Sequence, residues 1–141
     1  MTNIWWVNQN SSNKVNGVPA YEVVWSPYDT KEPHNPSEQW HWRTMWDAVA
    51  GDVVIHYSDQ KIVALSTVLT SATPARRPYD STPGSDWVEE GKQIVVSLTR
   101  LEAPIRKSEI PLDIRREASK NHGPFTEKGE DVKQGYFFPV P

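Results

Sequence analysis

Residues 52–69, DVVIHYSDQKIVALSTVL, decide the fold of this chain of 141 residues. Apolar and β-branched side chains alternate with a period of two from 52 to 57 and again from 61 to 69. That period places successive side chains on opposite faces of a β-strand. The polar residues 58–60 between the two runs predict a tight turn. Both faces of the predicted hairpin are largely apolar, as expected in a closed barrel with a helix packed outside.

A short helix is predicted immediately before this hairpin, over residues 42–49. Met45, Trp46 and Val49 would share one of its faces, because residues three and four apart are neighbours on a helix. Gly51 stands where a left-handed C-cap is wanted. We therefore expect Met45, Trp46 and Val49 to belong to the core.

The remaining elements are short and separated by long loops. Proline and polar runs predict loops at 26–37, 70–92 and 121–135. Ser108 is a candidate cap for a short helix towards Lys120, with Pro111 confined to its first turn. Further strands are predicted at 4–8, 21–25, 93–101 and 136–140. Together these elements predict one α+β domain over residues 1–141, a small mixed β-barrel flanked by short helices.

Composition excludes several classes of protein. The chain has no cysteine, which rules out disulfides, thiolate metal sites and a cysteine nucleophile. A formal net charge of -3 argues against a protein that simply coats nucleic acid, although a local basic face is compatible with it. No window has the apolar length of a membrane span, and the N-terminus does not resemble a signal peptide. We therefore expect a cytoplasmic protein with no membrane partner.

Motifs of enzyme chemistry are missing from the sequence. It contains no glycine-rich phosphate loop, no GxSxG elbow and no HExxH pair, and its four histidines lack metal-ligand spacing. Its carboxylates are explained by surface solvation and helix capping. We expect a binding domain with no catalytic residues, no metal and no cofactor.

The aromatic content is the strongest anomaly. Seven tryptophans exceed average usage several times, while the hydrophobic fraction is only 37%. Trp40 and Trp42 are not easily explained by packing, and Tyr79 and Trp87 share the 70–92 loop with basic residues. Aromatic rings beside arginines are typical of loops that stack on nucleic-acid bases.

Three amides, Asn8, Gln9 and Asn10, follow the first predicted strand. They form either an ordinary loop or a set of donors and acceptors that point into a site. Basic clusters such as Arg76 and Arg77 are equally compatible with a solvated face and with phosphate contacts. Taken together, the aromatic rings and amides favour recognition of one unstacked base.

The order of short motifs along the chain resembles the EVE domains of the PUA-like superfamily, which are related to YTH domains. Among EVE domains, the HWxxM and GDVVIHY motifs most resemble those at the N-terminus of McrBC-type, modification-dependent restriction enzymes. The motifs are WWV at 5–7, WHW at 40–42, VAGDVVIHY at 49–57, ALSTV at 64–68, API at 103–105 and KQGYFFPV at 133–140.

This resemblance implies a reader of modified nucleic acid whose base is flipped into an aromatic cage. It implies base contacts from Asn8, Gln9 and Asn10, with one cage ring from Trp40 or Trp42. The second ring would be Trp87 or, less favoured, Tyr79. The segment containing Lys133 and Gln134 would lie near the nucleic-acid backbone, and we add Arg43, Arg76 and Arg77 as phosphate contacts. Many YTH domains carry lysine at the position of Asn8, so specificity for methylated adenine is not implied.

The leading hypothesis is therefore a specificity domain that reads methylated or hydroxymethylated DNA for a restriction system, with a nuclease or NTPase domain in the full-length protein. Two alternatives stay open. The ligand could be modified RNA, or the domain could bind a protein or small molecule with its tryptophans in the core.

Overall fold

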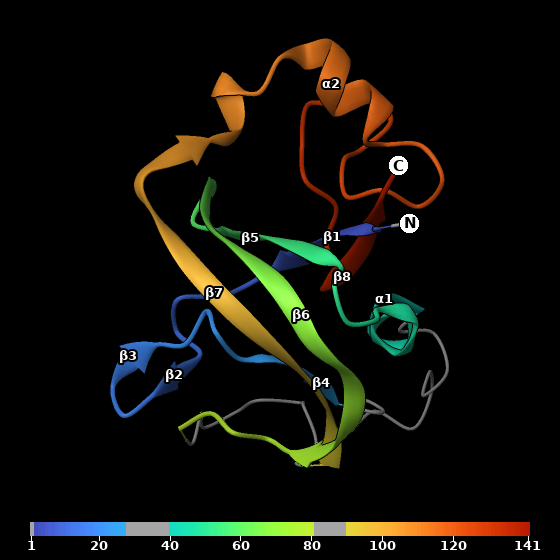
Figure 1. Ribbon diagram of the computed structural model, residues 1–141. Helices are drawn as coiled ribbons and strands as arrows, with labels where there is room; N and C mark the ends of the chain where they lie inside the picture. The colour runs from blue at the N-terminus through green and yellow to red at the C-terminus, as the bar shows by residue number, and fades with distance from the viewer. Residues whose placement is uncertain (1, 28–39, 81–89) are drawn as a thin grey trace, which may run out of the picture.

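The computed structural model describes residues 2–27, 40–80 and 90–141. Its main element is a curled, six-stranded sheet in the order β4-β7-β6-β5-β1-β8. In Figure 1 the long strands β6 and β7 cross the molecule as a twisted ribbon, while α2 lies at the top of the view and α1 at its right. This architecture confirms the predicted α+β fold, a PUA-like mixed barrel with few and short helices.

Strand β1 (Ile4–Asn8), next to the edge strand of the sheet, was predicted with these bounds. It pairs in parallel with β5 (Val53–Ser58) and antiparallel with β8 (Phe137–Val140), so the sheet is mixed. Neighbours on both sides satisfy its backbone, and both of its faces are covered. Trp5 and Trp6 accordingly point to opposite faces and are each almost fully buried.

Two apolar clusters cover these two faces. One contains Trp5, Trp42, Met45 and Phe137 and fills the inside of the curled sheet. The other surrounds Trp6 and includes side chains of the segment between α2 (Leu112–Glu117) and β8. The burial of large aromatic side chains in both clusters supplies most of the driving force for folding.

The predicted hairpin is confirmed and is longer than expected. Strand β6 (Lys61–Arg76) pairs antiparallel with β5 and with β7 (Glu90–Arg106). The predicted 70–92 loop is therefore wrong over 70–76 and 90–92, and the predicted end of β7 after residue 101 is also wrong. Register shifts in the β6/β7 ladder let the two strands bend around the core.

One face of β6 is exposed, which corrects the expectation that both faces are covered. Leu65 and Leu69 expose 42% and 52% of their surface, whereas Ala64 and Val68 beneath them are buried. No helix among the described residues covers that outer face, because α1 (Trp40–Arg43) lies at the opposite side of the sheet beside β8.

The helix before β5 differs from the prediction. It consists of α1 followed by a 3-10 turn, η1 (Thr44–Asp47). Three residues per turn bring side chains at intervals of three onto one face, so Trp42, Met45 and Ala48 are buried. Trp46 and Val49 are 46% and 49% exposed, and their predicted place in the core is wrong. Gly51 has a φ of +95° but belongs to the turn before β5, not to a C-cap.

Three smaller boundaries also shift. Strand β4 (Val24–Pro27) starts later than predicted, because residues 21–22 form a turn. Helix α2 starts after Pro111, and a separate 3-10 turn, η2 (Lys107–Glu109), includes Ser108, so Ser108 does not cap α2. A two-stranded hairpin of β2 (Lys14–Val15) and β3 (Val18–Pro19) completes the fold.

Asp52 joins β1 to the start of β5. Its carboxylate accepts hydrogen bonds from Trp5 Nε1 (3.0 Å) and from the backbone amides of Asn3 (3.1 Å) and Val49 (3.0 Å). Burial raises the pKa of Asp52, but these three hydrogen bonds outweigh it and the pKa is lowered. Asp52 is therefore a structural anchor.

In the described residues no helix is long and apolar enough to cross a membrane.

Candidate nucleic-acid interface

Hydrogen bonds from the side chain of Asn8 connect the end of β1 to the segment before β8. Its Nδ2 donates hydrogen bonds to the carbonyl oxygens of Lys133 (3.0 Å) and Gly135 (3.1 Å). Its Oδ1 accepts a hydrogen bond from Trp6 Nε1 (2.8 Å). Both donors of the amide are used, so only the second lone pair of Oδ1 remains for another group.

Gly135 connects Asn8 to the aromatic residues of α1. A Cβ atom built on Gly135 would lie 2.5 Å from Phe138 Cζ and 3.2 Å from His41 Cγ, and its φ is +145°. Only glycine fits this position without displacing both rings. The turn therefore packs directly against His41 and Phe138.

Trp40 is the exposed tryptophan of this region. It begins α1 and exposes 38% of its surface, and its ring centroid lies 5.2 Å from that of His122 and 5.7 Å from that of Phe138. Trp42, two residues later, is 3% exposed and belongs to the core. Of the two predicted cage candidates, only Trp40 presents its ring at the surface.

His41 adds a hydrogen-bond donor beside Trp40. Its Nδ1 accepts the backbone N–H of Tyr136 (3.0 Å), which places its proton on Nε2. Burial lowers the pKa of His41 to about 4, so the ring is neutral at pH 7. Within residues 2–27, 40–80 and 90–141, its Nε2 has no hydrogen-bond partner. Trp40, His41, Phe138 and His122 are called the Trp40 cluster below.

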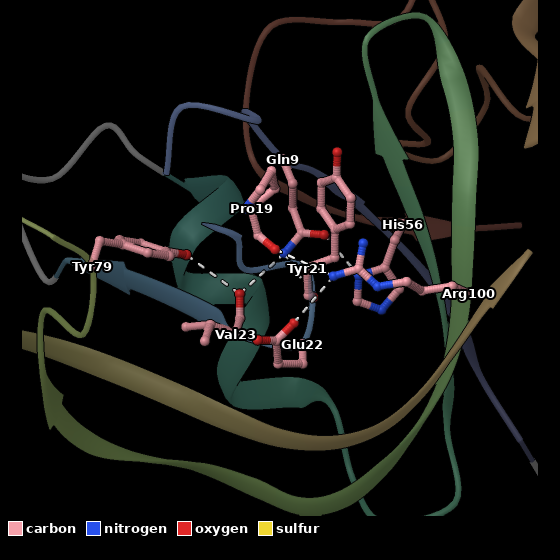
Figure 2. A network of polar contacts seen from close by, with 8 residues as sticks. All are labelled: Gln9, Pro19, Tyr21, Glu22, Val23, His56, Tyr79 and Arg100. Atoms are coloured by element: carbon pink, nitrogen blue, oxygen red, sulfur yellow. Dashed lines mark hydrogen bonds and ion pairs between the residues drawn. The ribbon is translucent and has the colours of Figure 1, made fainter. Parts of the chain in front are cut away.

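Gln9 points to the other side of β1 and is fully engaged. Its Nε2 donates to the carbonyl oxygens of Tyr21 (3.1 Å) and Val23 (3.0 Å), and its Oε1 lies 2.8 Å from His56 Nδ1. Figure 2 shows this network between β1, β5 and the segment before β4. Because Oε1 is an acceptor, His56 carries its proton on Nδ1 and accepts at Nε2 from Ser66 Oγ (2.7 Å).

Tyr79 belongs to the Gln9 network and not to the Trp40 cluster. Its hydroxyl donates to the carbonyl oxygen of Val23 (3.3 Å), the same oxygen that accepts from Gln9 (Figure 2). Its ring meets that of Trp25 edge to face at 6.1 Å. Burial raises the pKa of Tyr79 well above its usual value. Tyr79 thus supports the segment before β4.

The side-chain amide of Asn10 is only partly used by groups of the described residues. Its Oδ1 accepts the backbone N–H of Ser12 (2.9 Å), and its side chain is exposed. In the described parts of the chain, no hydrogen bond uses its Nδ2. Of the three predicted amides, Asn10 therefore keeps the most donor capacity for a ligand.

The predicted backbone contacts lie in two places. Arg43 is exposed at the end of α1, three residues after Trp40 and hence on the same side of the helix. Lys133 and the exposed Gln134 lie in the turn held by Asn8. Arg76 and Arg77 are at and just after the end of β6. The structure thus brings Asn8, Trp40, Arg43, Lys133 and Gln134 into one region, whereas Gln9 and Tyr79 form a separate one.

The predicted second cage ring, Trp87, lies outside the described residues. Within the described ranges, no group of three or more metal-binding side chains occurs. Sequence reasoning missed the residues around Trp40, namely His41, His122 and Phe138. The WHW motif was a signal for His41, but the histidines were considered only for metal-ligand spacing.

The topology defines the fold class: the chain has the EVE-type fold that the sequence motifs predicted. Two solved structures of this fold come from human thymocyte nuclear protein 1. Human THYN1 in complex with DNA containing 5-methylcytosine has a TM-score of 0.52 and 13% identity, covering 99% of this chain and 91% of that one. The DUF55 domain of the human protein has a TM-score of 0.51 and 15% identity, covering 97% and 90%.

A third similar structure is a hypothetical protein from Leishmania major. Its TM-score is 0.55 and its identity 15%, covering all of this chain and 88% of that one. No protein-family model matches the sequence, and a search of curated proteins found no match. The likeness is therefore one of fold.

Proposed function

We propose that this domain is a non-catalytic reader of modified DNA that stacks a modified base on Trp40. The observation that carries the proposal is a half-exposed tryptophan in an aromatic cluster on a fold that, in human THYN1, was solved with 5-methylcytosine DNA. In a duplex the base would have to be flipped out of the stack to reach the ring. Stacking on one aromatic ring contributes about 1–3 kcal/mol per base.

Specificity would come from the polar groups around that ring. The Nε2–H of His41 and the Nδ2 of Asn10 are donors without a protein partner in the described residues, and base edges offer oxygen and nitrogen acceptors. Asn8 would act through its spare Oδ1 lone pair and by holding the turn at 133–135. Gln9, whose amide is saturated by protein groups, would keep the end of β1 in place.

A second ring would complete the cage, and Trp87 is our candidate for it. Tyr79 is the less favoured candidate, because its ring packs on Trp25 and its hydroxyl is bonded to Val23. Backbone phosphates would be contacted by Arg43, Lys133 and Gln134 beside Trp40. Arg76 and Arg77 would contact a more distant part of the duplex.

The biological setting is part of the proposal. The HWxxM and GDVVIHY motifs resemble EVE-like domains of modification-dependent restriction enzymes, which supports a role as specificity domain of such a system. A nuclease or NTPase domain would then act on the DNA that this domain selects.

Competition between nucleic acids tests the proposal against its nearest alternative. A labelled duplex with one 5-methylcytosine is displaced by unlabelled DNA or RNA oligonucleotides, each with and without the modified base. We expect modified DNA to compete best and Trp40→Ala to remove that preference. Stronger competition by modified RNA would assign the domain to RNA instead, and a preference that survives Trp40→Ala would place the base elsewhere.

A further inference from the structure

A basic pocket that shares no lining residue with the Trp40 cluster lies where the tip of the β5/β6 hairpin meets η2. Its volume is about 300 Å³, and it is lined by Gln60, Lys61, Arg106, Lys107 and Ser108. That volume is at the lower end of the range of small-molecule sites, roughly 300–1,000 Å³. Three of the five lining residues are cationic in a chain whose net charge is -3.

Two of these cations face each other without an acidic partner. Lys61 and Arg106 are register partners in the β6/β7 ladder, and like charges directly opposite each other destabilise a sheet. Both are exposed, and within residues 2–27, 40–80 and 90–141 neither forms an ion pair. The repulsion between Lys61 and Arg106 destabilises the fold, so the presence of both cations needs another explanation. An anion bound between the two charges provides one.

Two of the nearby carboxylates are used by other groups. Asp131 pairs with Lys107 Nζ at 3.4 Å, and Glu109 Oε1 accepts the backbone N–H of Arg106 at 3.3 Å. Asp59 lies at the exposed tip of the hairpin. Of the three lining cations, Lys107 alone is thus neutralised within the described chain.

The walls of the pocket are held by hydrogen bonds. The backbone N–H of Lys107 donates to the carbonyl oxygen of Gln60 (3.0 Å), which ties η2 to the hairpin. The Tyr57 hydroxyl donates to Gln60 Oε1 (3.3 Å). Asp59 and Gln60 both have positive φ, 52° and 67°, a conformation of higher energy for residues other than glycine. The cations therefore project from a fixed frame, and the Ser108 hydroxyl and Gln60 amide supply further donors.

We propose that this pocket binds a phosphate group of the DNA backbone, as a second point of attachment beyond the modified base. The proposal rests on the proposed function for the nature of the ligand. Arginine and lysine are the side chains that bind phosphate most often, with arginine offering two parallel donors. Binding of phosphate would neutralise the Lys61–Arg106 repulsion, so the ligand would also stabilise the fold.

Thermal unfolding with inorganic phosphate tests the pocket without DNA. The Tm of the wild-type chain is measured in phosphate and in chloride at equal ionic strength, beside the double variant Lys61→Gln/Arg106→Gln. We expect phosphate to raise the Tm of the wild type by more than that of the double variant, which should show only the general stabilisation by a kosmotropic salt. In chloride the double variant should melt above the wild type, because the repulsion is gone. An equal rise in Tm of both proteins in phosphate would overturn the proposal that this pocket binds phosphate.

The salt dependence of binding to an unmodified duplex tests the assignment to DNA. The slope of log K against log salt should become shallower by about 1 in the double variant. The matched control is Lys14→Gln/Lys128→Gln, which removes two exposed lysines outside the pocket and should leave the slope unchanged. An unchanged slope in the double variant, with the response to inorganic phosphate lost, would overturn the DNA assignment and leave a site for free phosphate.

The ratio of affinities for modified and unmodified duplexes separates this proposal from the proposed function. Phosphate contacts are independent of sequence, so the double variant should bind both duplexes more weakly and keep the wild-type ratio. If the wild type bound modified and unmodified duplexes equally, the proposed reading of a modified base would be contradicted. The phosphate and salt-slope experiments would still test whether the pocket binds phosphate.

Discussion

Trp40 and Trp42 are two residues apart and lie in opposite environments. The Trp42 side chain is 3% exposed and packs on Trp5, Met45 and Phe137, whereas Trp40 is 38% exposed. A truncation at the buried position leaves a cavity, but at the surface position it removes mainly an exposed ring. The pair therefore allows the structural role of Trp42 to be separated from the ligand-binding role that we propose for Trp40.

Replacement of each tryptophan by alanine tests this separation. We expect Trp42→Ala to lower the free energy of unfolding by about 3–5 kcal/mol, and Trp40→Ala to lower it by about 1 kcal/mol or less. Only Trp40→Ala should weaken binding of a modified duplex while the fold stays intact. Urea unfolding and binding isotherms on the same preparations give both quantities. A large loss of stability in Trp40→Ala would show that Trp40 has a structural role instead of the proposed ligand-binding role.

His56 makes the stability of the domain dependent on pH. It is fully buried between Gln9 and Ser66, and burial lowers its pKa to about 4. The unfolded chain binds a proton near pH 6.5 and the folded chain does not until about pH 4. The stabilisation is therefore fully present above pH 6.5 and is lost as the pH falls towards 4, by about 3 kcal/mol for this residue.

Urea unfolding at pH 7 and pH 4.5 measures this loss. The variant His56→Gln should be less stable than the wild type at pH 7 but should lose less stability on acidification. His41, whose pKa is also lowered to about 4 but which is partly exposed, adds a smaller effect of the same sign. Identical pH dependence in the wild type and in His56→Gln would show that folding does not lower the pKa of His56.

At the scale of elements, the turn before β8 joins the Asn8 amide to the Trp40 cluster. Gly135→Ala would force a Cβ atom against Phe138 and His41 at a φ of +145°. We expect a loss of about 1–3 kcal/mol from overpacking, added to the backbone strain. We also expect weaker binding of the modified duplex, because His41 must move.

The control is Gly17→Ala, which has a φ of +77° but no atom within 4 Å of the new Cβ. It carries backbone strain without a clash, so its stability loss should be smaller and its ligand affinity unchanged. Equal losses in the two variants, measured by urea unfolding, would mean that the contact of Gly135 with His41 and Phe138 has no role.

Alternation of apolar residues was sufficient to predict the β5/β6 hairpin, because the side-chain period of a strand is visible in the sequence. Aromatic and β-branched residues were sufficient to predict β1. Alternation failed at 70–76, where Pro74 and the polar neighbours suggested a loop. The paired partner β7 and the register shifts hold that segment in the sheet. The core positions predicted for the helix at 42–49 were wrong because this segment contains a 3-10 turn, whose period differs from that of the α-helix that we assumed.

At the scale of the whole molecule, the order of motifs predicted the EVE-type fold, while the grouping of site residues could not be predicted. Asn8 and Gln9 are adjacent in sequence, but successive strand residues point to opposite sides. Asn8 therefore joins the turn at 133–135, and Gln9 joins Tyr79 at Val23. The pocket at Lys61 and Arg106 depends on pairing between residues 45 positions apart, which no local pattern reveals.

The central claim is that the domain distinguishes a modified base from its unmodified counterpart. Affinities for matched short duplexes test it most directly, with one strand unmodified or carrying 5-methylcytosine, 5-hydroxymethylcytosine or N6-methyladenine at a single position. We predict that one modified duplex binds at least about ten-fold more tightly than the unmodified one, a difference of about 1.4 kcal/mol that lies within the range of stacking energies. Equal affinity for all four duplexes would contradict the account.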